Sequence, residues 1–235
     1  MLNRFLFITV LFLFFSCGNE KVLQLPEIQN ADITEVLDVS PAYIFYDETK
    51  QDSVELNRKN LIISTNWLVN VDKRLTLEQA LPSIIKLQEK KRIATMHKNE
   101  KAKNYYTCND TSVKNLGFID FTDVIYKNLE IKKDTIEKPT FLPKGYNRRI
   151  DGLFANSPLS VFFNKDLNLE IGSKILSLNE FIEKVKLNFK ETNAIGHYKL
   201  NFNKKMNFQD YITIKSKLLK MNGKYFSLNN NEFIY

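Results

Sequence analysis

Hydrophobic and polar residues alternate clearly in the second half of the chain. Leu159, Val161 and Phe163 are each separated by one residue, which is the spacing of a strand with one buried face. The same alternation, or a short apolar run beside turn residues, predicts further strands over 167–171, 198–202 and 225–228. The last of these precedes an asparagine-rich turn and residues 232–235.

Two helices are predicted between these strands. Ser177 and Glu180 have the spacing of a capping box, and Asn207 with Asp210 can cap the second helix. Behind each cap, apolar residues recur on one helical face: Leu178, Phe181, Ile182, Val185 and Phe189, then Phe208, Tyr211, Ile212, Leu218 and Leu219. The order β-β-α-β-α-β predicts helices packed on one side of a mixed sheet.

The best helix of the first half covers residues 76–92. Thr76 and Gln79 resemble a capping box, and the apolar residues that follow share a face. Pro82 lies past the first turn and is expected to kink this helix. Trp67, the only tryptophan, begins the preceding strand and is expected in the core.

Two segments of the first half are echoed in the second half, in the same order. SPAYIFYD at 40–47 resembles SPLSVFFN at 157–164, and VNVDKRLTLE at 69–78 resembles LNFNKKMNFQ at 200–209. The echoes lie further apart in the second copy, which leaves room there for one extra helix. We therefore predict an α+β protein of two related small domains, each a mixed β-sheet with helices packed on one side.

The first residues have a different pattern. Residues 5–15 read FLFITVLFLFF, an apolar run that follows the single charge of Arg4 and is too short to span a bilayer. A charged start, an apolar core and a small residue are typical of a secretory signal. Ser16-Cys17 resembles the lipobox of bacterial lipoproteins, although Phe14 and Phe15 depart from that motif. The resemblance implies cleavage before Cys17 and a lipid, such as palmitate, on its thiol.

These patterns divide the chain into five parts. The signal peptide occupies 1–16 and a polar tether 17–39, where no strong apolar periodicity is found. The first α+β domain occupies 40–127 and the second 157–235. Between them, residues 128–156 combine charges with Pro139, Pro143 and Gly145, which is typical of a linker.

Composition and charge favour a folded body that meets anionic partners. Hydrophobic residues make up 43% and charged residues 26%, which are near the globular average. Only seven glycines are present, and no GxGxxG or P-loop pattern occurs. The net charge is +7, which attracts lipid head groups, cell-wall polymers or nucleic acid. Export makes nucleic acid the least favoured of the three, so none is expected.

A cluster of cations follows the first helix and is the candidate patch for such a partner. It consists of Lys90, Lys91, Arg92, Lys98, Lys101 and Lys103. The alternative interpretation is a solvated helix end, where cations complement the helix dipole.

Cys108 is the only cysteine left once Cys17 carries lipid, so no disulfide can staple the mature chain. A buried thiol is the simplest interpretation. The alternative is an envelope hydrolase in which His97 serves Cys108 as a base. Asp110, Asp120 and Asp123 are a weaker hypothesis for calcium, because no EF-hand spacing is present. No cofactor or metal is predicted.

The second copy, 177–223, and residues 69–77 with Asp72 resemble the periplasmic domain of ExbD/TolR-type biopolymer-transport subunits. Asn203 replaces the aspartate in the second copy. The resemblance implies the fold, a tendency to form homodimers and binding to envelope partners. It does not imply a proton-driven motor, because the N-terminal apolar run holds no acidic residue.

Together these observations predict a lipoprotein of the bacterial cell envelope, facing the periplasm or the cell surface. Its expected role is a non-catalytic binding or structural module, with the membrane and an envelope protein or the cell wall as partners. A place in an envelope transport or secretion assembly is a further expectation.

Overall fold

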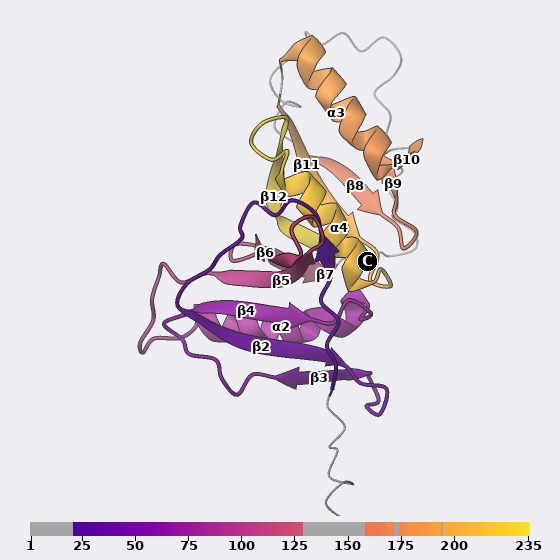
Figure 1. Cartoon of the computed structure of the whole chain (residues 1–235). Helices are drawn as coiled ribbons and strands as arrows, with labels where there is room; N and C mark the ends of the chain where they lie inside the picture. Colours follow the sequence, from indigo (N-terminus) through magenta and orange to yellow (C-terminus); the bar gives the residue numbers. More distant parts are fainter. Residues whose placement is uncertain (1–20, 129–157, 172–173, 194) are drawn as a thin grey trace, which may run out of the picture.

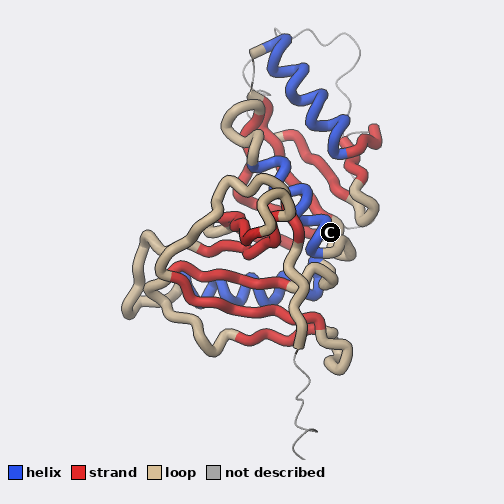
Figure 2. The backbone as a smooth tube through the Cα atoms, in the orientation of Figure 1, coloured by secondary structure: helices blue, strands red, loops and turns tan. Residues whose placement is uncertain are grey.

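The computed structural model describes residues 21–128, 158–171, 174–193 and 195–235. These residues form two six-stranded sheets and three helices (Figure 1). Each sheet combines parallel and antiparallel strands, so the predicted α+β class with two mixed sheets is confirmed. Figure 2 shows that the strands of the two sheets run in different directions.

The first sheet has the order β1-β5-β4-β2-β3, with β6 added on β5. Its parallel strands are joined through crossovers, whereas β2 pairs with β3, and β5 with β6, in antiparallel hairpins. Its strands are β1 (Glu27–Ile28), β2 (Val39–Tyr46), β3 (Val54–Asn57), β4 (Asn66–Val71), β5 (Asn104–Asp110) and β6 (Asn115–Asp120).

The second sheet has the order β10-β9-β8-β11-β12-β7. Its strands are β7 (Ile125–Asn128), β8 (Leu159–Phe163), β9 (Asn168–Ile171), β10 (Lys174–Ser177), β11 (Gly196–Phe202) and β12 (Phe226–Ile234). The strand expected at 225–228 is longer than predicted: β12 continues through the expected turn to Ile234, because its pairing with β11 resumes after a register shift.

The helices are α2 (Leu77–Arg92), α3 (Leu178–Thr192) and α4 (Phe208–Leu219), and all three predictions are confirmed. Thr76 and Ser177 form capping boxes with Gln79 and Glu180, and the Asn207 side chain accepts a hydrogen bond from the Asp210 N–H at 2.7 Å. These bonds satisfy amides that a helix N-terminus leaves free. The α-helix α2 continues through Pro82 to Arg92.

The two sequence echoes occupy equivalent places in the two sheets. The first echo forms β2 and β8, and the second forms β4 with the start of α2, and β11 with the start of α4. Asn70 donates from its side chain to the Ala42 carbonyl at 3.0 Å, and Asn201 donates to the Val161 carbonyl at 3.1 Å. The extra helix expected in the second copy is α3, which precedes β11.

The two copies are joined directly to each other. The segments before α2 and α4 run antiparallel. The Leu77 N–H donates to the Met206 carbonyl at 2.9 Å, and the equivalent Phe208 N–H donates to the Leu75 carbonyl at 2.7 Å. This reciprocal pair relates the copies by an approximate two-fold axis, as in a symmetric dimer.

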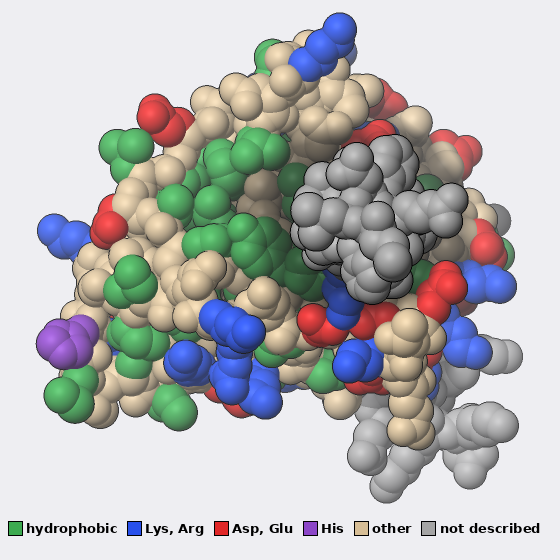
Figure 3. Space-filling model, turned by 60° about the horizontal axis from the view of Figure 1, so that its bottom comes forward, with side chains coloured by type: hydrophobic (Ala, Val, Ile, Leu, Met, Phe, Trp, Pro, Cys, Tyr) green, Lys and Arg blue, Asp and Glu red, His purple; other side chains and the backbone are tan. Residues whose placement is uncertain are grey.

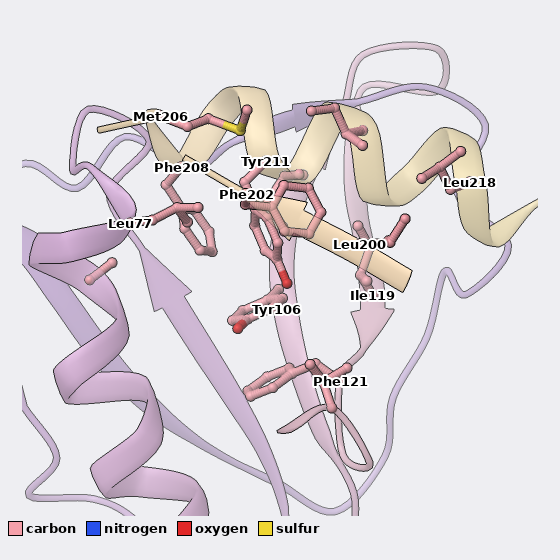
Figure 4. Close-up of a cluster of buried hydrophobic side chains, with 14 of the residues drawn as sticks. Leu77, Tyr106, Ile119, Phe121, Leu200, Phe202, Met206, Phe208, Tyr211 and Leu218 are labelled. Atoms are coloured by element: carbon pink, nitrogen blue, oxygen red, sulfur yellow. The ribbon is translucent and has the colours of Figure 1, made fainter. Parts of the chain in front are cut away.

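One hydrophobic core spans both copies. Tyr106 on β5 contacts the Phe208 ring edge-to-face at a centroid distance of 5.2 Å, and Tyr211 contacts Phe202 on β11 at 5.1 Å (Figure 4). Trp67 is fully buried, as its sequence position predicts. Since apolar burial is the main stabilising term in folding, the copies are expected to unfold together.

Two expected boundaries fall inside these sheets. The strand β7 follows the first copy in sequence but pairs with β12 of the second sheet. The strand β1 lies in the segment expected to be a tether and pairs with β5. Most of the expected linker, residues 129–156, lies outside the described residues, as do the signal peptide and Cys17.

Candidate functional site

The chain that begins four residues after the expected lipid anchor is built into the fold. We call residues 21–33 the N-terminal strap. Lys21 donates to the Asp47 carboxylate at 2.8 Å and also pairs with Glu55. The Gln24 carbonyl accepts a hydrogen bond from the Lys73 N–H at 2.8 Å, so the strap continues along the end of β4.

The strap also contacts the second copy. The Gln209 side chain, in α4, accepts from the Glu27 N–H at 2.8 Å and donates to the Glu27 carbonyl at 2.9 Å. Lys220 donates to the Gln29 carbonyl at 2.7 Å. A side-chain amide that pairs with both backbone groups of one residue replaces a strand neighbour. The strap therefore connects the expected anchor to both copies.

Asp110, at the end of β5, fixes the last part of the strap. Its carboxylate accepts from the Ala31 N–H at 2.6 Å, from the Asn30 N–H at 3.2 Å and from the Ser112 hydroxyl at 2.6 Å. These bonds favour the ionised form. Led by the Ala31 bond, they lower the pKa of Asp110 to about 2, from an ordinary value of 3.8.

We expect this carboxylate to make the strap sensitive to acid. Because its pKa is lower in the folded than in the unfolded protein, its contribution is complete above about pH 4 and is lost as the pH falls towards about 2. In urea unfolding between pH 5 and pH 2, Asp110→Asn should reduce the loss of stability seen in the wild type. Asp123→Asn, at an exposed position, is the control and should leave that loss unchanged. Equal acid sensitivity in the wild type and Asp110→Asn would contradict the prediction.

The predicted cation patch is divided by the structure. Lys98 pairs with Glu100 at 2.9 Å, and Lys103 pairs with Asp120 at 2.8 Å. Arg92 is exposed and donates to a backbone carbonyl at 3.0 Å. Lys90, at the end of α2, is partly exposed, and Lys101, in the loop that follows, is exposed.

Lys91 is buried and has a structural role, unlike the exposed cations of the predicted patch. Its ammonium group is buried and donates to the carbonyls of Thr65 at 3.0 Å and Lys103 at 2.9 Å, and to the Asn104 side chain at 3.2 Å. It also lies 4.9 Å from the centre of the Trp67 ring. Its three donors are satisfied inside the protein, so Lys91 joins the two loops beside the strand starts and cannot meet a partner.

The burial of Lys91 predicts a stability gain at alkaline pH. Burial lowers its pKa to about 8, from an ordinary value of 10.5. Between these values the unfolded chain binds more protons than the folded protein, so the free energy of unfolding should rise with pH, by at most about 1.4 kcal/mol per unit. Urea unfolding at pH 7.5, 8.5 and 9.5 measures this rise. Lys91→Met should remove it, whereas the exposed Lys101→Met should retain it.

Cys108 and His97 are in different environments. Cys108 lies in β5 with no exposed surface, and burial strongly raises the pKa of its thiol. A nucleophilic cysteine needs the opposite shift, towards thiolate. His97 lies exposed in the loop after α2. Asp110 and Asp120 are engaged by the strap and by Lys103, and the described residues hold no group of metal-binding side chains.

Sequence reasoning did not find a groove beside α2. It has a volume of about 800 Å³ and lies between α2 and the end of β12. Ile85 and the exposed Pro82 form part of its wall, and its lining also includes Leu77, Glu78, Leu81, Lys86, Glu89, Asn128, Lys204, Ile234 and Tyr235. Pro82 was a sequence signal at this place, because a proline past the first turn of a helix is unusual.

Five polar side chains connect the copies within the core. The Tyr126 hydroxyl, on β7, lies 2.6 Å from the Tyr106 hydroxyl and 3.0 Å from that of Tyr211. Tyr211 donates to the Glu232 carboxylate at 2.7 Å, and Glu232 pairs with Lys215. We call this set the buried polar network. A satisfied network of this kind specifies one packing arrangement.

Over the described ranges, the three helices are too short or too polar to cross a bilayer. The sequence matches no family model, and comparisons with curated proteins and with solved structures returned no match.

Proposed function

We propose that this protein is a lipid-anchored component of the bacterial cell envelope that acts as a non-catalytic binding or structural module. The observation that carries the proposal is the position of the strap. Lys21 follows the lipobox-like Cys17 by four residues and is already paired with Asp47. A lipid on Cys17 would therefore hold the folded body directly.

The short connection limits how far the body stands from the bilayer. Four residues span at most about 14 Å when fully extended. The body would then act close to the membrane surface, unlike a domain on a long flexible tether. The strap would distribute any pull on the anchor over both copies, because it bonds to Asp47 in the first and to Gln209 in the second.

The groove beside α2 supports the binding role. Its surface is mostly apolar, its charged lining residues are Glu78, Lys86, Glu89 and Lys204, and its lining includes no serine, cysteine or histidine. Concave apolar surfaces with a few charged groups are typical of binding sites. An envelope protein is the proposed partner, with the cell wall, a second copy of the chain and a transport or secretion assembly as further proposals.

Cell fractionation with matched variants tests the anchor. In the native bacterium, wild type and Cys108→Ala should remain in the membrane fraction after an alkaline wash, since Cys108 lies in the core. Cys17→Ala should lose the lipid and either accumulate as the uncleaved precursor or leave the membrane fraction. Equal retention of a processed Cys17→Ala chain would contradict the proposal.

A further inference from the structure

Three loops meet at the end of the first sheet where β2, β4 and β5 begin. The Asn66 side chain donates to the Leu37 carbonyl at 2.8 Å, and the Asn99 side chain donates to the Ser64 carbonyl at 3.1 Å. We call this region the loop tip and define it as Leu37 with residues 58–65 and 93–103. Its hydrogen bonds and the buried Lys91 hold the loops together.

The loop tip exposes aliphatic side chains that the core does not use. Leu37 is 71% exposed, Ile62 57%, Ile93 77% and Met96 74%. Single exposed aliphatic residues are ordinary, whereas several at one end of a soluble protein indicate an interaction surface. None of the four lines the groove beside α2.

The segments that carry these side chains hold more basic than acidic residues. Within the loop tip and the last turn of α2, Glu89 and Glu100 are outnumbered by Arg58, Lys59, Lys90, Arg92, Lys98, Lys101 and Lys103. On the face drawn in Figure 3, hydrophobic and basic side chains lie side by side towards the left. Aliphatic side chains that insert, together with lysines that meet phosphate groups, are the chemistry of attachment to anionic lipid.

The loop tip and the strap lie at opposite ends of β2. Leu37 precedes this strand, whereas Asp47, which binds Lys21, directly follows it. A strand of this length spans roughly 26 Å. A second contact at this distance from the lipid anchor would fix the orientation of the body on the membrane.

We propose that the loop tip is a second membrane-contact site that binds an anionic lipid surface. When the loop tip and the lipid on Cys17 both contact the membrane, the first sheet lies along the bilayer. This orientation rests in part on the proposed lipid anchor. The helix α3, which lies at the opposite end of the molecule from β3, then points away from the bilayer (Figure 1).

Vesicle sedimentation with the mature chain carrying Cys17→Ser tests the site without the lipid anchor. The vesicles contain phosphatidylglycerol and phosphatidylethanolamine, or phosphatidylcholine alone. We expect binding to the anionic vesicles, little binding to phosphatidylcholine, and loss of binding at high salt. Ile93→Ser with Met96→Ser should weaken binding about tenfold, because these side chains no longer insert. Ile175→Ser, 71% exposed on β10 of the second sheet, is the matched control and should bind like the parent chain.

Absence of binding to anionic vesicles would overturn the inference, as would equal binding by the Ile93→Ser/Met96→Ser chain. Thermal unfolding of every variant checks that the fold is retained. As a second readout, a fluorescent label on Lys101→Cys should shift to shorter wavelength with vesicles, whereas a label on Leu187→Cys in α3 should not. All these chains lack Cys17, so absence of vesicle binding would overturn the loop-tip site without testing the lipid anchor. The lipid anchor is tested by the fractionation of the native protein.

Discussion

Glu232→Gln should destabilise the protein by about 3 kcal/mol or more. Glu232 is 1% exposed and pairs with Lys215, which is 4% exposed on its side chain. The substitution leaves the Lys215 ammonium group buried without its counter-charge, and breaking a buried pair in this way costs about 3–5 kcal/mol. Urea unfolding at pH 7 measures the change.

Two further variants show whether the buried charge is the cause. Glu183→Gln removes the partner of Lys186 in an exposed pair of 2.9 Å on α3, and it should change stability by less than about 0.5 kcal/mol. Glu232→Leu combined with Lys215→Met removes both charges and should recover much of the loss, because apolar residues of similar volume replace a buried pair well. A free energy of unfolding for Glu232→Gln within about 1 kcal/mol of the wild-type value would contradict this prediction, because the two charges would then not be buried in the core.

Phe208→Ala should destabilise both copies of the fold together. The ring of Phe208 is fully buried and contacts Tyr106 across the junction of the copies. Truncating a buried phenylalanine costs about 3–5 kcal/mol through lost contacts and the remaining cavity. Because one core spans the junction, this substitution in the second copy should also lower the stability of the first.

Trp67 makes this expectation measurable. It is the only tryptophan and lies in β4 of the first copy, so its fluorescence reports that copy alone. The fluorescence transition and the far-UV circular dichroism transition should shift by the same amount in Phe208→Ala. Leu187→Ala, at an exposed position in α3, should shift neither by more than about 0.5 kcal/mol. An unchanged Trp67 transition beside a shifted dichroism transition would mean that the copies unfold separately.

The junction between the two copies restricts the surfaces that the predicted homodimer could use. The reciprocal bonds of Leu77 and Phe208 already pair the two copies within one chain. A surface that would join two subunits of a simpler, one-copy protein is therefore covered internally. A homodimer of the whole chain stays a prediction, and it would need another surface, such as the groove beside α2.

The sequence predicted elements whose signals are local. Capping residues such as Ser177 and Asn207, together with apolar periodicity, placed the starts of α3 and α4 where the structure has them. The repeated segments predicted equivalent strands. Each copy has an asparagine at the same place, Asn70 or Asn201, and the two asparagines make equivalent hydrogen bonds. In these cases one short segment carries all the information.

The remaining features depend on contacts between distant residues. The strand β1 is two residues long, and Gln209, far away in sequence, holds its backbone. No periodicity can indicate such a strand. The β5–β6 hairpin lacked a repeat partner in the sequence, because β12 occupies the matching place without a hairpin of its own.

The residues of the candidate site also differ in whether a local sequence signal or a distant contact determines their role. Lys91 belonged by sequence to a row of cations, but its burial depends on carbonyls of Thr65 and Lys103. Met96 gave no signal, because a single apolar residue in a polar loop is ordinary until the fold places the loops together. The thiol of Cys108 was best interpreted as buried, and the structure places it in the core.

We propose that a lipid on Cys17 holds the fused copies at the membrane through the N-terminal strap. The most direct test is mass spectrometry of the intact protein after gentle detergent extraction from its own cells, with sequencing of its first peptide. We expect residues 1–16 to be absent and Cys17 to carry acyl chains. A chain that retains residues 1–16, or a processed chain with an unmodified Cys17, would contradict the proposal.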